Sequence, residues 1–143
     1  MGELIIPKPA VGAGVAALEA ALPAHYDVEL VSSDLPGLAN GHRTYPTLFV
    51  RMTRVGPSGM LNMVTDRARL LVECYADKDS DTDCEQFANT CRALLRAVDT
   101  RTRFAGAYIR RWQNDTGPVP YPDPSVPSHE RWQFQGDLLV STN

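Results

Sequence analysis

The sequence predicts an α+β domain: a mixed, mainly antiparallel sheet of about five strands, with two helices packed on one face. Two stretches, residues 9–22 and 82–98, repeat apolar residues at the spacing of a helix. Several others alternate apolar and polar residues, as half-buried strands do. The length of 143 residues favours a single domain over residues 1–143.

The first helix is predicted over residues 9–22, because its larger apolar side chains recur every three or four residues. Pro23 is expected to end it. Residues 26–31 then alternate as a half-buried strand. The side chains expected to face the core are Val11, Val15, Leu18 and Leu22 from the helix, and Tyr26, Val28 and Leu30 from the strand.

Residues 47–55 and 66–76 are predicted to pair as a hairpin, since about ten residues separate them. The tip of this hairpin contains Met60, Leu61 and Met63. Methionine adapts readily to a binding surface, so the tip is a candidate contact with a partner; the alternative is that it folds back on its own core. The core face of the two strands would carry Leu48, Val50, Met52, Ala68, Leu70, Val72 and Cys74.

An acidic turn, Asp77–Asp83, precedes the second helix, which is predicted to end near Val98. Thr82 and Glu85 have the spacing of a capping box, and acidic residues suit the positive end of a helix dipole. The turn lacks the glycine and the glutamate of a calcium loop, which favours a solvated helix start. The core face of the helix would carry Cys84, Phe87, Ala88, Cys91, Leu94, Leu95 and Val98.

The C-terminal third is predicted to form a fourth strand over residues 103–113, a proline-rich loop or arm over 114–129, and a closing strand over 130–141. Two interpretations of the proline segment stay open. Its prolines stiffen either an arm that lies along a neighbouring subunit or an internal crossover that brings the last strand into the sheet. The closing strand would bury Trp132, Phe134, Leu138 and Val140.

Charge, histidine and cysteine patterns indicate no catalytic chemistry. The net charge of −3 gives no reason for tight nucleic-acid binding, and the arginines between residues 92 and 111 are read as a solvated face rather than a phosphate contact. The three histidines have no zinc-ligand spacing, and the three cysteines are read as buried apolar residues. We therefore expect no enzyme activity, no cofactor, no metal site and no membrane span.

The order of parts carries a resemblance to a known family. YDVELV follows the first helix, RTYPTLFVRMTRVG forms a strand after a Tyr-Pro pair, RARLLVECYADKDSDTDCEQFANTCRALL joins a strand to a long helix, and ERWQFQGDLLVS closes the chain. This arrangement resembles the tail terminator proteins of long-tailed (siphovirus-type) bacteriophages, particularly those of actinobacterial phages. The resemblance covers nearly the whole chain, through order and length rather than through one specific motif.

The resemblance implies a structural virion protein without catalytic residues. Members of the family form a homo-hexameric ring that caps the tail tube, stops its elongation and provides the surface for head joining. The implied partners are other copies of the chain, the major tail tube protein and the head connector or stopper protein, with genomic DNA passing through the lumen without specific binding. The implied location is the head–tail interface of the virion, after synthesis in the host cytoplasm.

Two groups of residues are candidates for roles in such a ring. The candidate subunit or tube interface comprises Met60, Leu61, Met63, Pro120, Tyr121, Pro122 and Pro124. The candidate lumen-facing acidic loop comprises Asp77, Asp79 and Asp81, whose negative charge would keep DNA from sticking. Two alternatives remain: a head–tail connector or head-closure subunit, and a small α+β enzyme or ligand-binding domain with a pocket between helices and sheet.

Overall fold

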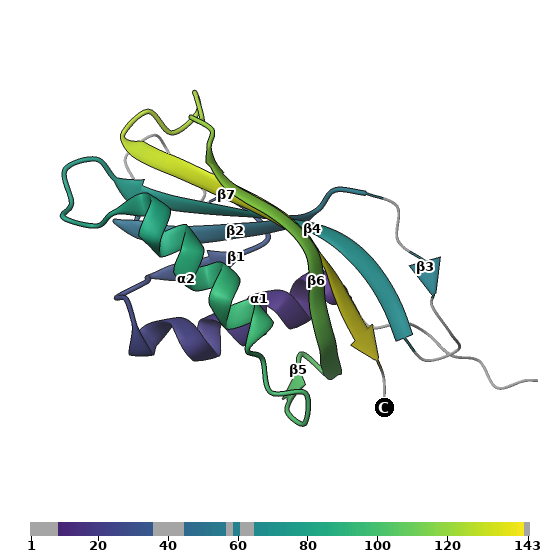
Figure 1. Ribbon diagram of the computed structural model, residues 1–143. Helices are drawn as coiled ribbons and strands as arrows, with labels where there is room; N and C mark the ends of the chain where they lie inside the picture. The colour runs from purple at the N-terminus through teal and green to yellow at the C-terminus, as the bar shows by residue number, and fades with distance from the viewer. Residues whose placement is uncertain (1–8, 36–44, 57–58, 61–64, 142–143) are drawn as a thin grey trace, which may run out of the picture.

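The computed structural model describes residues 9–35, 45–56, 59–60 and 65–141 (Figure 1). Within these ranges the chain forms two α-helices, one short 3-10 helix (η1) and seven strands of a single sheet. In chain order the elements are α1 (Ala10–Ala21), η1 (Leu22–Ala24), β1 (Leu30–Ser32), β2 (Leu48–Arg54), β3 (Gly59–Met60), β4 (Thr65–Asp77), α2 (Cys84–Arg96), β5 (Arg103–Phe104), β6 (Ala107–Pro120) and β7 (His129–Ser141).

The sheet has the order β1-β2-β4-β7-β6-β5, with β3 pairing beside β4. Only the β1–β2 pair is parallel among the described strands, and the other pairs are antiparallel. Both helices cover the same face, and the long strands β4, β7 and β6 curl around α2 (Figure 1). The predicted fold class is confirmed, and the two two-residue strands β3 and β5 account for the larger number of strands.

The main core lies between the helices and the sheet. The predicted core face of the central strands is buried there as expected, and so is that of the closing strand except for Trp132, which is only partly buried. Helix α2 presents its predicted face, with Leu94 partly buried, but it ends at Arg96, and Val98 packs partly buried against the core just beyond it. The largest fully buried side chains of this core are Leu18, Leu22, Val50, Met52, Leu70, Phe87, Leu95, Ile109, Phe134 and Leu138.

Helix α1 packs through small residues rather than through its predicted valines. Leu18 and Leu22 are buried as expected, but Val11 and Val15 are only partly buried. A Cβ atom at Gly14 would collide with the Met52 sulfur, so the missing side chain brings the helix close to β2. The helix face that touches the sheet is completed by Ala10, Ala13 and Ala17.

The predicted strand over residues 26–31 is wrong in extent and in facing. The strand starts at Leu30, whose partner in the parallel pair is Phe49. Tyr26 and Val28 pack against the main core, whereas Leu30 packs against a second cluster on the other face of the sheet. The alternating pattern fails here because residues 26–29 precede the strand and do not follow its two-residue repeat.

The start of α2 also differs from the prediction. The residue that caps the helix is Asp83, whose carboxylate accepts a hydrogen bond from the Gln86 backbone N–H at 3.3 Å. Thr82 therefore lies outside the cap. An aspartate placed one residue later reaches the free N–H group of the third helical residue, which is the position that an N-cap satisfies.

The bounds predicted for the fourth strand and for the proline-rich loop are wrong. Residues 103–113 contain β5 and the start of β6, joined by Ala105 and Gly106 at φ angles of 52° and 81°. Strand β6 continues to Pro120, so the segment predicted as a loop or arm over 114–129 is loop only between the ends of β6 and β7. Pro118 and Pro120 are tolerated because β5 covers only the start of the outer edge of β6.

Candidate functional site

A second buried cluster lies on the sheet face opposite the helices. Phe49 and Tyr75 stack with ring centroids 4.3 Å apart, and Tyr45 stacks on the other side of Phe49. The β6–β7 loop covers this stack with Val126, which is fully buried. The loop that joins β6 and β7 therefore folds onto its own sheet, as the connection of a hairpin between adjacent antiparallel strands rather than as a crossover.

Arg131 joins this cluster to a buried group of charges. Its Nη1 atom donates to Glu73 Oε2 at 2.5 Å and lies 3.4 Å from Asp123 Oδ2. The Tyr75 hydroxyl donates to the same Asp123 oxygen at 2.8 Å. The side chains of Arg131 and Glu73 are only 10% and 4% exposed, so neither has bulk water to replace its partner. Burial is the main reason that the pKa of Tyr75 is well above its ordinary value.

The same arginine fixes the start of the β6–β7 loop. Its Nε atom donates to the Tyr121 carbonyl oxygen at 2.6 Å, and Nη2 donates to that of Pro122 at 3.5 Å. The guanidinium group also lies over the Tyr121 ring, 5.2 Å from the centroid. At the other end of the loop, His129 is buried with Nε2 2.7 Å from the Pro46 carbonyl oxygen. The loop is therefore held at both ends.

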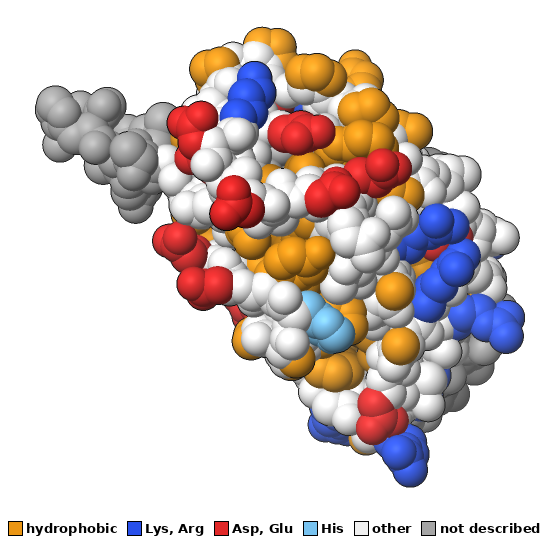
Figure 2. Space-filling model, turned by 60° about the vertical axis from the view of Figure 1, so that its left-hand side comes forward, with side chains coloured by type: hydrophobic (Ala, Val, Ile, Leu, Met, Phe, Trp, Pro, Cys, Tyr) orange, Lys and Arg blue, Asp and Glu red, His pale blue; other side chains and the backbone are white. Residues whose placement is uncertain are grey.

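Residues 119–124, which we call the ridge, are exposed to solvent although Arg131 holds their backbone in place. Val119 is 50% exposed and Tyr121 is 58% exposed, although both are large apolar side chains. Pro120, Pro122 and Pro124 are exposed beside them. Figure 2 shows apolar side chains gathered over the end of the β6–β7 hairpin. An exposed apolar surface on a rigid support loses little entropy on docking, which suits it to binding.

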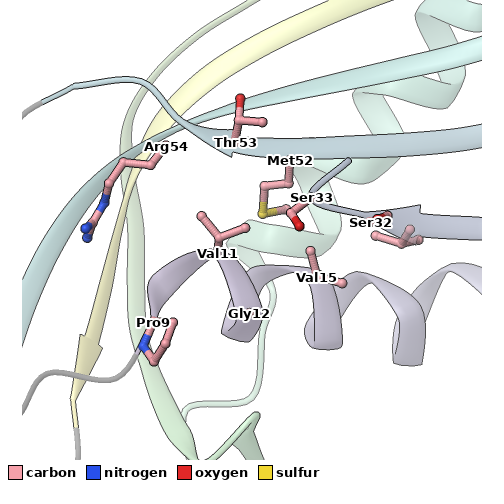
Figure 3. A pocket seen from close by; sticks show the side chains of 10 residues that line it. Pro9, Val11, Gly12, Val15, Ser32, Ser33, Met52, Thr53 and Arg54 are labelled. Atoms are coloured by element: carbon pink, nitrogen blue, oxygen red, sulfur yellow. The ribbon is translucent and has the colours of Figure 1, made fainter. Parts of the chain in front are cut away.

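A groove of about 560 Å³ lies between α1 and the β1–β2 edge of the sheet. Figure 3 shows Val11 and Val15 of α1 pointing toward Met52 of β2. Ser33 lies between the ends of the groove, and Arg54 lies at one end, over Pro9. The groove exists because β1 pairs with β2 only as far as Arg51, while β2 continues to Arg54.

The predicted acidic loop forms a compact turn at the end of β4. The Asp77 carboxylate accepts a hydrogen bond from the Asp79 backbone N–H at 2.9 Å, and Asp79 and Asp81 are exposed. Figure 2 shows acidic side chains gathered on this side of the molecule, close to the apolar end of the hairpin. Whether this turn faces a lumen stays a prediction.

Several of the arginines between residues 92 and 111 form ion pairs with aspartates of the same chain. Arg92 and Arg96 donate to Asp115 at 2.6 and 2.9 Å, and Trp112 Nε1 donates to the same carboxylate at 3.0 Å. The bond from Arg92 is the main reason that the pKa of Asp115 is far below its ordinary value. Arg101 pairs with Asp99. This arrangement favours the solvated-face interpretation over a phosphate contact.

The structure brings together only part of the predicted interface. Pro120, Tyr121, Pro122 and Pro124 form the ridge, whereas Leu61 and Met63 lie outside the described residues. Met60 belongs to β3, where it pairs with Asp66. Sequence reasoning missed the groove and Arg131. One signal for the second cluster was available: Phe49 and Tyr75 are bulky aromatics on the face of two adjacent strands that otherwise carries charges.

The cysteines lie in the interior of the protein. Cys74, Cys84 and Cys91 are free and buried, as predicted, and burial raises the pKa of the Cys84 thiol to about 12. In the part of the chain that the structure describes, no three His, Cys, Asp or Glu side chains are grouped so that they could hold a metal ion. Neither described helix is long and apolar enough to cross a membrane.

Comparison with known protein families and with curated proteins finds no match for this chain. The functional argument therefore depends on the surfaces of the chain itself. Those surfaces are a rigid apolar ridge at the β6 side of the sheet and an apolar groove at the β1 side.

Proposed function

We propose that this chain is a ring-forming structural protein of a bacteriophage tail, in the role of a tail terminator. In that role, copies of the chain form a hexameric ring that caps the tail tube, stops its elongation and receives the head connector. The order of helices and strands that resembles the terminator family supports this proposal. The ring size and the tube and head partners come from that resemblance alone.

The observation that carries the proposal is the position of the exposed apolar side chains. Among the described residues, the large apolar side chains classed as exposed are Val55, Val119 and Tyr121. Two of them belong to the ridge, and Val55 directly follows Arg54 at the end of the groove. Exposed apolar groups held on rigid elements favour a role in protein association over a role in catalysis.

The test is a capping assay with tail tubes assembled from the tube protein of the same phage genome. A tail terminator is expected to bind one end of each tube in electron micrographs and to stop further growth there. Tubes that keep elongating in a molar excess of the chain, with no density at their ends, would contradict the proposal. Density on the head connector but none on tubes would instead support the head-closure alternative.

A ligand-binding role is the second candidate, and the groove is the observation that favours it. Its volume of about 560 Å³ falls within the range of about 300–1,000 Å³ that small-molecule sites occupy. Its lining is mostly apolar, and Figure 3 shows the polar side chain of Ser33 beside Met52. A screen for small molecules that raise the melting temperature tests it, and Val15→Trp, which fills the groove, is expected to abolish any such shift.

A further inference from the structure

We propose that the ridge of one copy of this chain fills the groove of the next copy. This inference deepens the proposed function, because it names the two surfaces that would meet at each contact of the ring. The partner is a second copy of the chain, and the contact joins two different surfaces. Such a head-to-tail contact closes into a ring when the rotation between copies allows it.

The first argument is placement. The ridge follows β6 and the groove borders β1 and β2, so the two surfaces lie on opposite sides of the sheet. Four strand spacings separate β1 from β6 in the sheet order, a distance of about 19 Å at about 4.8 Å per spacing. One copy therefore has room to engage a neighbour through each surface at once, which a ring requires and a two-fold dimer does not.

The second argument is position along the strands. Pro120 pairs with Trp132 near the start of β7, close to the end of β4. Arg54, at the groove, pairs with Leu70, which in turn pairs with Gly136 further along β7. The ridge and the groove are therefore displaced along the strands as well as across them.

The third argument is chemical fit. The ridge is exposed and mostly apolar, with the Tyr121 ring as an anchor of the kind that dominates interface energies. The groove is concave and is floored by Met52, whose flexible thioether adapts to an incoming ring. The charges beside the two surfaces are opposite in sign: Glu130 is exposed beside the ridge, and the Arg54 side chain, which pairs with Asp66 at 3.5 Å, is 44% exposed at the groove.

The free edges of the sheet argue against simple strand pairing as the alternative contact. Strand β6 has three register shifts against β7 and carries Pro118 and Pro120, which lack the N–H groups that a neighbouring strand needs. Strand β1 is only three residues long. Among the described strands, the edges are therefore blunted, and contacts between copies fall to side-chain surfaces such as the ridge and the groove.

Disulfide trapping between two different variants tests the inference. Tyr121→Cys protein is mixed with Val15→Cys protein under mild oxidation by oxidised glutathione, and linked dimers are measured on non-reducing gels. The three natural cysteines are buried, so they compete little for oxidation. The mixture is expected to give a linked dimer that neither variant gives alone.

Matched controls use exposed positions on the same elements. Ser125→Cys replaces Tyr121→Cys within the same loop, and Glu19→Cys replaces Val15→Cys one helical turn further along α1. A mixture that contains either control is expected to show no dimer above background. Equal trapping in the control mixtures, or a dimer from Tyr121→Cys alone, would overturn the inference.

A general amine cross-linker applied to the wild-type chain separates the two levels of the proposal. If the wild-type chain forms rings or cross-linked oligomers and the cysteine pair does not link, the ridge–groove contact is wrong and a ring-forming role survives. If the cysteine pair links but tail tubes are not capped, the contact is supported and the tail-terminator role falls. If neither oligomers nor linked pairs form, the ridge–groove contact is wrong, and the capping assay alone decides the role.

Discussion

The two faces of the sheet are buried in different ways. On the helix face, apolar side chains from α1, α2 and five strands form one continuous core. On the opposite face, a smaller aromatic stack is covered by a loop, and Arg131 joins that loop to Glu73. The helix face depends on volume and apolar area, whereas the opposite face depends on hydrogen bonds between charges. The two faces should therefore respond to different kinds of substitution.

The largest effect is expected on the charged face, from Arg131→Met. This substitution leaves Glu73 buried, with Arg51 at 3.6 Å as its one remaining ionic partner among the described residues. It also removes the hydrogen bond that holds the start of the β6–β7 loop. The free energy of unfolding should fall by about 3–5 kcal/mol, as for other broken buried pairs. Urea unfolding measures it. The double variant Arg131→Met with Glu73→Leu should lose less than the single variant; an equal or larger loss would show that the pairing with Glu73 is not the cause.

Asp115→Asn should destabilise the chain by about 2–3 kcal/mol at pH 7, because two arginines and Trp112 lose a charged acceptor. The folded chain holds the pKa of Asp115 below its ordinary value of about 4. The stabilisation is therefore complete above about pH 4 and is lost as the pH falls toward the lowered pKa. The difference between wild type and variant should shrink below pH 4. A difference that stays constant down to pH 2 would contradict this assignment.

On the helix face, Gly136→Ala tests volume. A Cβ atom there would overlap the Trp112 ring, which lies directly over Gly136. We expect a loss of about 1–2 kcal/mol in unfolding free energy, without dependence on pH between 5 and 8. The control is Gly12→Ala, where the added Cβ meets nothing closer than 3.7 Å and alanine favours the helix, so stability should rise by up to about 1 kcal/mol. Equal effects of the two substitutions would contradict the role of Trp112.

The smallest effect on folding is expected from Tyr121→Ala. The Tyr121 side chain is mostly exposed, its hydrogen bonds use backbone atoms, and its ring lies against the Arg131 guanidinium. The unfolding free energy should fall by no more than about 1 kcal/mol. Self-association, measured by sedimentation, should weaken by about tenfold or more if the ring is an interface anchor. A large loss of stability would show that the ridge serves its own fold.

The sequence predicts the helix face well because periodicity reports which side chains share a face. The stripe that contains Phe87 and Leu95, and the alternation that contains Phe134 and Leu138, appear in the structure as predicted. The predicted stripe of α1 failed at Val11 and Val15, because the helix approaches the sheet through its glycine and alanines. Small residues that let a helix approach a sheet closely carry little apolar side chain, so the apolar pattern of the sequence does not reveal them.

The opposite face was harder to predict, because its cover comes from a loop. Arg131 alternates as an exposed residue would, and only the pairing of Pro120 with Trp132 brings the loop over it. The prolines predict a stiff loop or arm, but Pro118 and Pro120 belong to strand β6 near the edge of the sheet. Part of the candidate site, Tyr121 and its neighbouring prolines, was predicted from sequence; the groove was not, because it depends on where β1 stops.

The subunit count of the assembly that forms at tail-tube ends tests the central claim most directly. Native mass spectrometry of the chain released from capped tubes, after light cross-linking, gives that count. A closed ring of six copies, lost when Tyr121 is replaced by alanine, is the expected result. A chain that leaves tube ends uncovered and keeps the mass of a single copy at every concentration would contradict the account.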